Sequence, residues 1–222
     1  SGVYFQVTSN IDLDVSPYNT GAGWTPIGTG TGTTTRFYGN FDGNDLVISN
    51  LLINSSGTTY QGLFGSSVGS IIDLGLEDVS VTVNGSVASA YVGALVGRNY
   101  GTVTNSYVTG TVTSQRYNVG GMIGYNDGGT VTGSYTTTDV TAPIFIGGMF
   151  GSTSGTVSDV YATGAISGSN HSIGGLTGHL FGAGSITTSY ATGTVSGPGS
   201  TGGLIGWLED GDVSDSYATG DI

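Results

Sequence analysis

The chain has no cysteine and no lysine among its 222 residues, and its only cations are Arg36, Arg98 and Arg116. Without cysteine, neither a disulfide bond nor a thiolate metal site can form. Binding to nucleic acid needs clustered Lys or Arg to neutralise phosphates, and docking on an anionic membrane needs them too. The formal net charge of -12 therefore disfavours both kinds of partner.

Long apolar runs are also missing. No stretch approaches the roughly 20 apolar residues of a membrane-spanning helix, and Ser1 opens directly on strand-like sequence with no signal peptide. If the protein is secreted, we therefore expect this chain to be a processed form or an excised domain. Charged residues make up only 8% of the chain, so Ser, Thr, Asn and Gly must solvate most of the surface. This composition is typical of an extracellular repeat protein.

What the sequence does contain is a repeat. The motif Gly-Gly-Leu-Ile-Gly has several near-copies along the chain. Its last glycine recurs at steps of 27, 27, 27 and 28 residues, at Gly97, Gly124, Gly151, Gly178 and Gly206. A diverged copy ends at Gly65. A fixed period of this length indicates a solenoid, a propeller or an array, in which each repeat buries its apolar face against its neighbours.

Aliphatic residues also recur in register, separated by Gly, Asn, Asp or Ser. One column follows the motif, at Ile71, Val103, Val131, Val157, Ile186 and Val213. Each repeat thus holds about three short apolar pieces rich in β-branched residues, which favours strands with glycine corners. Helix is disfavoured because glycine in a helix interior costs about 1 kcal/mol relative to alanine. A propeller blade needs about 40 residues, more than this period.

The pattern therefore predicts an all-β fold, a parallel β-helix or β-solenoid with about three short strands per coil. Right-handed coiling is the favoured hand for parallel crossovers. Coils spaced by about 4.8 Å would place equivalent residues above one another as ladders. We expect such structural ladders at Leu95, Met122, Met149, Leu176 and Leu204 and at Tyr107, Tyr135, Tyr161, Tyr190 and Tyr217. The paired glycines have two explanations, positive φ at a corner or close approach of neighbouring coils.

Residues 1–57 differ from the rest and are predicted to form an N-terminal β cap, because terminal repeats of solenoids are usually atypical. Residues 58–222 are predicted to form about six coils of the solenoid.

The motif Gly-Gly-Leu/Met-x-Gly, followed by Gly-Thr-Val-x-x-Ser-Tyr-Ala-Thr-Gly-x-Val, resembles the GLUG-motif repeat of bacterial and archaeal extracellular surface proteins. The best copies span residues 174–195 and 202–222. Departures are Ala94 at the second glycine, methionine at two motif positions, and three threonines at 136–138 in place of Ala-Thr-Gly. The resemblance implies an adhesin, a stalk or a filament component. It carries over no catalytic residues, because the repeat itself is not known to supply any.

Two repeated columns invite a binding interpretation. The tyrosine ladder could be an aromatic platform for carbohydrate, but a structural column is favoured because every repeat carries one tyrosine. Threonines spaced two apart, such as Thr102 and Thr104, point to one face and could form an ice-binding array. In the last repeat the equivalent residues are Asp212 and Ser214, so the threonine column is not maintained and ordinary solvation of the strand is favoured.

The densest group of acidic residues is Glu209, Asp210, Asp212 and Asp215. Hard cations take oxygen ligands, which makes this group a candidate calcium site. The spacing lacks the full pattern of a strong calcium loop, so a solvated turn is favoured. No other cofactor is expected.

Catalytic residues are not expected either. His171 and His179 are eight residues apart without a third ligand, and both are interpreted as structural or incidental.

We therefore predict a non-enzymatic extracellular protein, a cell-surface stalk or a filament-forming subunit. The alternative is a carbohydrate-binding adhesin domain of a longer surface protein; an ice-binding or polysaccharide-degrading solenoid is less favoured. Expected partners are further repeats of a longer chain, surface glycans, or a second copy joined head to tail. In the last case, the exposed strand at residues 3–7 would pair with the final coil, because open parallel edges accept additional strands.

Overall fold

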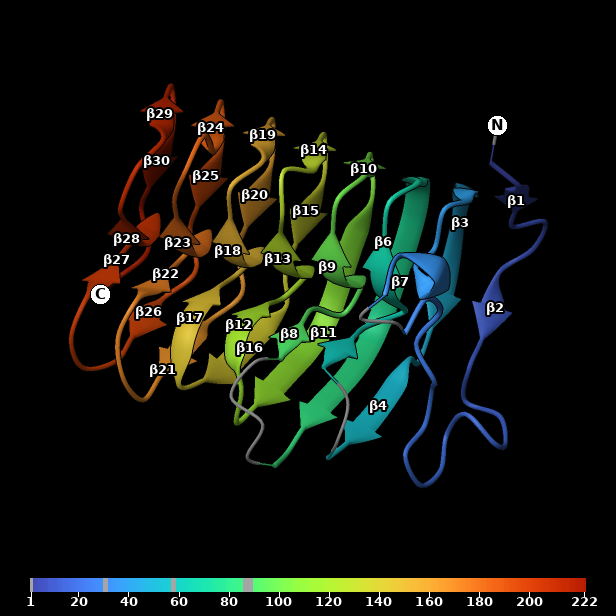
Figure 1. The fold of residues 1–222 in the computed structure, drawn as a ribbon. Helices are drawn as coiled ribbons and strands as arrows, with labels where there is room; N and C mark the ends of the chain where they lie inside the picture. Colours follow the sequence, from blue (N-terminus) through green and yellow to red (C-terminus); the bar gives the residue numbers. More distant parts are fainter. Residues whose placement is uncertain (1, 30–31, 57–58, 86–89) are drawn as a thin grey trace.

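The computed structural model describes residues 2–29, 32–56, 59–85 and 90–222, and it is an all-β solenoid. Its coils stack side by side, and the two ends of the chain lie at opposite ends of the stack (Figure 1). Within the described ranges the only helix is the short 3-10 turn η1 (Thr33–Thr35). No helix in these ranges is long and apolar enough to cross a membrane. The predicted parallel β-solenoid is confirmed, because every strand pairing in the structure is parallel apart from one isolated bridge.

Each coil contributes to three sheets. Sheet C contains β5 (Tyr60–Gln61), β8 (Tyr91–Val92), β12 (Tyr117–Gly120), β17 (Ile144–Gly147), β22 (Ile173–Gly174) and β27 (Thr201–Gly202). Sheet B contains β6 (Phe64–Ser67), β9 (Val96–Asn99), β13 (Ile123–Asn126), β18 (Phe150–Thr153), β23 (Thr177–Leu180) and β28 (Ile205–Leu208). Six successive coils thus pass through sheet C, sheet B and then sheet A.

Sheet A is the large third wall. Its first part contains β1 (Tyr4–Gln6), β2 (Ile11–Asp12), β3 (Asn40–Ser49), β4 (Leu52–Ser55), β7 (Ser70–Val83), β10 (Thr102–Thr104) and β11 (Tyr107–Ser114). The later coils add β14 (Thr130–Thr132), β15 (Tyr135–Thr136), β16 (Asp139–Ala142), β19 (Thr156–Ser158), β20 (Tyr161–Ala162), β21 (Ile166–Gly168), β24 (Ser185–Thr187), β25 (Tyr190–Ala191), β26 (Val195–Ser196), β29 (Asp212–Ser214) and β30 (Tyr217–Ala218).

In six successive coils, the sheet A part of the chain passes through a residue of left-handed backbone conformation at an aligned position. The aligned bend positions are Asp73, Asn105, Gly133, Asp159, Thr188 and Asp215, with φ between 49° and 59°. Gly, Asn and Asp tolerate this region because a short polar side chain or a missing Cβ lowers its steric cost. The later coils divide their sheet A part into two or three short strands, which gives the middle coils five strands in all, whereas β7 continues through Asp73 and Asp78 as one strand.

The core is a set of aliphatic ladders. Leu95, Met122, Met149 and Leu176 are at most 1% exposed, and Leu204 in the last coil is partly buried against them. The column after the motif is in strict register, because Val131 pairs with Val157, which in turn pairs with Ile186. Each fully buried aliphatic side chain contributes roughly 1.5–3 kcal/mol. The aliphatic ladders predicted from the repeat are therefore the core of the solenoid.

The last glycine of the motif is explained by close approach. At Gly151 an added Cβ would lie 2.3 Å from the backbone nitrogen of Val119 and 2.6 Å from the carbonyl oxygen of Gly124, in the preceding coil. Gly124 meets the backbone nitrogen of Val92 in the same way, at 2.4 Å. Neither glycine has a positive φ. The paired glycines, for which the sequence left two explanations open, behave alike: Gly121 and Gly148 have no positive φ, and an added Cβ would lie 2.2 Å from the carbonyl oxygen of Gly148 and 2.4 Å from that of Gly175.

Residues 2–29 and 32–56 close the N-terminal end of the stack. β1 and β2 pair with β3, Leu13 and Phe37 are buried in the core cluster, and the indole nitrogen of Trp24 donates to the carbonyl of Leu63 at 3.0 Å. β3 and β4 already pair with β7 in parallel register. The ladder therefore runs on across residue 57 without a break in the described strands, and the domain boundary proposed there stays a prediction.

Candidate functional site

The tyrosine ladder lies on the outside of sheet A. The ring centroids of Tyr107, Tyr135, Tyr161, Tyr190 and Tyr217 are 4.8–5.3 Å apart, and neighbouring rings are within 7° of parallel. Burial between the rings raises the pKa of Tyr161, and burial together with a hydrogen bond to Glu77 raises that of Tyr107 to about 12. Each inner ring has both faces against its neighbours, which leaves no inner face for a sugar and supports the structural interpretation.

Sheet B carries a column that varies from coil to coil. The residue directly after the last motif glycine points outward in each strand of this sheet, and register pairs Ser66, Arg98, Tyr125, Ser152, His179 and Trp207 in this order. A structural column would repeat one residue type, as the tyrosines do. The variation therefore indicates that the fold does not determine the residue type in this column of the surface.

Aromatic rings from neighbouring columns gather around this variable column. The ring of His179 stacks on Trp207 at 4.4 Å, on Phe181 at 4.7 Å and on Phe145 at 5.3 Å between centroids. Tyr125 stacks on Phe181 at 5.7 Å, and its ring centroid lies 5.4 Å from that of Tyr91, with the two ring planes tilted by 36°. We call the set Tyr91, Tyr125, Phe145, His179, Phe181 and Trp207 the aromatic face. The sequence analysis did not identify it.

A cavity opens in the aromatic face where the middle coil carries a small residue. Its volume is about 350 Å³, and it is lined by Tyr91, Asn118, Tyr125, Phe145, Ser152, His179 and Phe181. The Ser152 hydroxyl donates to Asn118 Oδ1 at 2.6 Å. Aromatic walls with a few converging polar groups, in a space of this size, are the usual features of a small-molecule site.

Phe145 occupies an unusual backbone position in this cavity. Its φ is 53°, and the equivalent residues of the adjacent coils, Asn118 and Ser172, have φ of 56° and 61°. Asn is among the residues that adopt this conformation readily, whereas a bulky aromatic residue there is a genuine outlier that costs on the order of 1–3 kcal/mol. Such outliers cluster at binding sites. The conformation places the Phe145 ring in the wall of the cavity.

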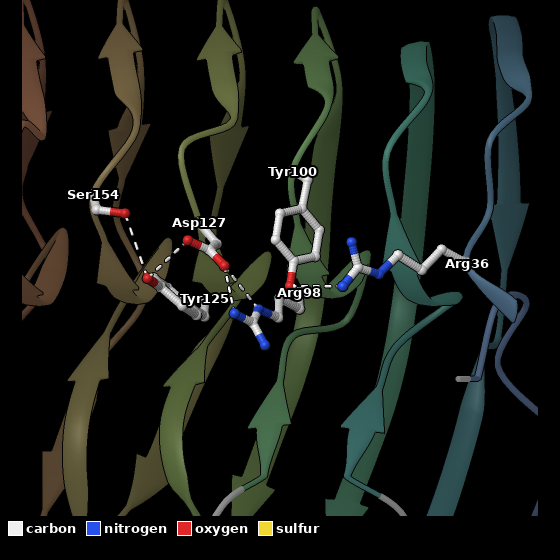
Figure 2. Close-up of polar contacts among 6 residues, drawn as sticks. All are labelled: Arg36, Arg98, Tyr100, Tyr125, Asp127 and Ser154. Atoms are coloured by element: carbon white, nitrogen blue, oxygen red, sulfur yellow. Dashed lines mark hydrogen bonds and ion pairs between the residues drawn. The ribbon is translucent and has the colours of Figure 1, made fainter. Parts of the chain in front are cut away.

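Next to the cavity, arginines and tyrosines form a polar network across the coils (Figure 2). Arg98 binds Asp127 with its Nε at 3.0 Å and its Nη2 at 2.5 Å, and the Tyr125 hydroxyl donates to Asp127 Oδ1 at 3.0 Å. The Arg36 guanidinium lies 4.1 Å from the centre of the Tyr100 ring. The network ties the N-terminal cap to the coils of β9 and β13 and fixes the Tyr125 ring at one end of the cavity.

His179 is held by one carboxylate of the acidic group proposed as a calcium site. Its Nε2 lies 3.0 Å from Glu209 Oε2. Asp212 lies in β29 and Asp215 at the bend of sheet A. In the described part of the chain no three His, Asp or Glu side chains are placed to hold a metal ion, so the structure does not gather Glu209, Asp210, Asp212 and Asp215 into a site.

The His179 pKa predicts a pH dependence of stability. Burial lowers this pKa below its ordinary value of 6.5, and the Glu209 hydrogen bond only partly opposes the shift. Between the lowered pKa and 6.5, the unfolded chain binds a proton that the folded chain does not. This contribution to stability is therefore complete above pH 6.5 and is lost as the pH falls below it. Urea unfolding from about pH 8 to about pH 5 measures the slope.

The matched control for this prediction is His179→Phe, which keeps a ring in the stack but removes the titrating group. We expect its stability to change less over the same pH interval. An equal slope in both proteins would show that other groups cause the dependence.

The threonine pairs are in register as expected, with Thr102 and Thr104 beside Thr130 and Thr132. In the later coils this column continues through Thr156 and Ser185 to Asp212. The two-coil array is too short to single out ice binding, and ordinary solvation of the strand explains it.

Comparison with known proteins confirms the resemblance to GLUG-motif repeats. The GLUG motif matches residues 88–113, 169–196 and 197–222. Halomucin from Haloquadratum walsbyi is 37% identical over 125 residues, which cover 54% of this chain and 1% of halomucin. A protein of Evansella cellulosilytica, provisionally named a Gly-rich membrane protein, is 40% identical over 106 residues, which cover 47% of this chain and 12% of that protein. The matched segments are thus small parts of much longer relatives.

A solved structure shares the fold. The crystal structure of a protein from Bacteroides ovatus, provisionally described as an immunoglobulin A1 protease, superposes with a TM-score of 0.75 over 98% of this chain and 69% of that chain. The sequence identity is 22%, so the likeness extends to the fold and carries no activity to this chain.

Proposed function

We propose that this chain, a β-solenoid carrying GLUG-motif repeats, is a rigid, non-catalytic spacer of a longer protein at the cell surface. The observation that supports the proposal is the unbroken parallel register of sheets B and C through six coils. Each coil is held by backbone hydrogen bonds and buried ladders to its neighbours, so bending requires many contacts to break together. The relatives are named halomucin and, provisionally, a Gly-rich membrane protein, which supports a surface location.

A spacer should lengthen without loss of order when coils are added. We expect a second copy of residues 143–197, inserted after Gly197, to extend the rod by roughly 10 Å, two coils of about 4.8 Å each. Dyes on cysteines introduced at the two ends measure this by energy transfer, without background because the chain has no cysteine of its own. A single unfolding transition at an equal or higher temperature is expected as well. Two separate transitions, or an unchanged length, would contradict the proposal.

A catalytic role finds little support in the geometry. A serine nucleophile needs a histidine within hydrogen-bonding reach, but the Ser152 hydroxyl donates to Asn118 and His179 Nε2 faces Glu209. We expect no turnover with polysaccharide or protein substrates. Turnover abolished by Ser152→Ala or by removal of one carboxylate would overturn this part of the proposal.

Head-to-tail assembly is the second candidate. Val3 and Tyr4 are 66% and 58% exposed on the first edge strand, and Leu208 and Tyr217 are 52% and 53% exposed on the last coil. A parallel pairing of β1 with the final coil would cover exposed apolar side chains at both ends and, being heterologous, would propagate a filament. Electron microscopy at high concentration tests this. Filaments that disappear when residues 1–8 are deleted support it, and persistent monomers rule it out.

A further inference from the structure

Three asparagines differ from all the others in the chain. Of the twelve asparagines, nine use the side-chain amide in a hydrogen bond. The remaining three, Asn54, Asn84 and Asn170, form no side-chain hydrogen bond with any described residue. The same three, and no others, begin an Asn-x-Ser sequence, which is the acceptor pattern for N-linked glycosylation.

We infer that Asn54 and Asn170 are attachment sites for N-linked glycans, so that the solenoid carries carbohydrate along one edge. This modification belongs to exported proteins, so the inference rests on the surface location proposed above. Asn84 is left out because Ser86, the third residue of its acceptor sequence, lies outside the described residues.

Exposure alone does not separate these asparagines from the others. Asn19 and Asn105 are exposed as well, but the Nδ2 atom of each donates to a carboxylate at 3.1 Å. A sugar on such an amide would compete with the hydrogen bond. A sugar on Asn54 or Asn170 displaces no hydrogen bond, so the folded chain can carry it without leaving a partner unpaired.

The backbone does not require asparagine at these two positions either. Asn50 and Asn118 have φ of 60° and 56°, a conformation that asparagine tolerates better than most residues. Neither Asn54 nor Asn170 has a positive φ. Asn54 lies inside β4, although asparagine is depleted in strands. Its register column otherwise consists of hydroxyl residues, namely Thr82, Thr113, Thr141, Ser167 and Ser196.

Both asparagines lie at the edge where sheet A turns into sheet C. β4 ends at Ser55 and β21 ends at Gly168, and register connects these strands through β7, β11 and β16. β4 and β21 both lie on the lower side of the stack (Figure 1). The two sites are four coils apart, roughly 19 Å, which leaves room for two glycans. Sheet B and its aromatic face take no part in this edge and would stay uncovered.

The transfer is a substitution at the first sugar. The asparagine Nδ2 bonds to the anomeric carbon of a lipid-diphosphate-linked oligosaccharide, while the bond from that carbon to the diphosphate breaks. The lipid diphosphate leaves with the electron pair, and one amide proton passes to a base of the transferase.

The folded structure also indicates when the transfer takes place. The backbone nitrogen of Asn54 donates to the carbonyl of Ala22 at 2.9 Å. Ser172, the third residue of the other acceptor sequence, is 1% exposed, and its hydroxyl lies 2.9 Å from His171 Nδ1. Neither sequence can enter a transferase from this state. The transfer therefore precedes folding, and the fold has only to tolerate the product.

Peptide mapping of the whole chain tests the inference. The chain is secreted behind an added signal sequence from a eukaryotic host, which supplies the lipid-linked oligosaccharide. Release of the glycans by peptide N-glycosidase in heavy-oxygen water converts each modified asparagine to labelled aspartate. We expect the label at Asn54 and at Asn170, in protein with the circular dichroism of a β fold. An unlabelled asparagine at either position would overturn the inference.

This result is independent of the proposed surface location, because the added signal enforces export. Antibody labelling of intact natural cells measures the location separately. The spacer role depends on length and rigidity and is tested by the inserted coils.

Matched variants assign the glycan at position 54. Asn54→Gln and Ser56→Ala should each remove it and leave the glycan at Asn170. Ser56→Thr keeps a hydroxyl at the third position of the acceptor sequence and should retain both glycans. Persistence of the glycan in Ser56→Ala, or its loss in Ser56→Thr, would contradict attachment through this sequence.

A double variant, Asn54→Gln with Asn170→Gln, measures whether the fold tolerates the glycans. Both side chains are exposed and make no hydrogen bond to a described residue. We therefore expect the glycosylated parent and the double variant to be secreted in similar amounts and to melt within about 2 °C of each other. Secretion of the double variant alone would show that glycans at these positions are incompatible with the fold, and would also overturn the inference.

Discussion

Val157→Asp is expected to abolish cooperative folding of the chain. Val157 is fully buried, and its register partners in β14 and β24, Val131 and Ile186, are aliphatic as well. A carboxylate placed there loses its hydration and gains no hydrogen-bonding partner, which costs on the order of 4 kcal/mol or more. A single domain is stabilised by only about 5–15 kcal/mol. Thermal unfolding followed by circular dichroism measures the loss.

The matched control is Thr156→Asp, one residue earlier in the same strand. Thr156 is exposed, and Asp212 occupies the corresponding position two coils later, through the register of β24 and β29. We expect a change within about 0.5 kcal/mol. If Val157→Asp and the parent had similar melting temperatures, this ladder would not belong to the core. The assignment of the inner face of sheet A would then be wrong as well.

The repeat period allowed most of the fold to be predicted. A side chain such as Met122 or Val157 contacts its equivalents in the next coils, so one column of the sequence corresponds to one ladder of the structure. The bends of sheet A also recur with the repeat, because Asp159 and Asp215 occupy positions at which the backbone has a positive φ. The same local role distinguishes the members of the last acidic group. Its members serve different parts of the coil.

The aromatic face could not be predicted from the same periodicity. Phe145 belongs to the column of Asn118 and Ser172, and Phe181 lies two residues beyond His179, so no single repeat position contains the whole set. The cavity exists because Ser152 is small, which is a property of one coil. The signal that the sequence did offer is the variation after an otherwise constant glycine. In a repeat protein, the columns whose residue type varies from coil to coil are the ones that the fold does not require to be constant.

Gly151→Ala is expected to destabilise the protein by about 3 kcal/mol, the upper end of the usual cost of overpacking, because the added methyl would meet backbone atoms that cannot rotate away. The added methyl would lie 2.3 Å from the carbonyl carbon of Asn118 and from the nitrogen of Val119, both backbone atoms of the preceding coil. Relief requires sheets B and C to separate, which would break neighbouring rungs of both ladders. Denaturant unfolding measures the change.

The control for this glycine is Gly32→Ala in the N-terminal cap, where an added Cβ would meet no atom within 4 Å. Because alanine restricts the unfolded chain and meets no obstacle here, we expect a change within about 1 kcal/mol, neutral or stabilising. If Gly151→Ala proved equally mild, the coils would be able to move apart by several tenths of an ångström at no cost. A stack with that freedom could not act as a rigid rod, so this one methyl group tests the mechanical basis of the spacer as well as the packing of the motif.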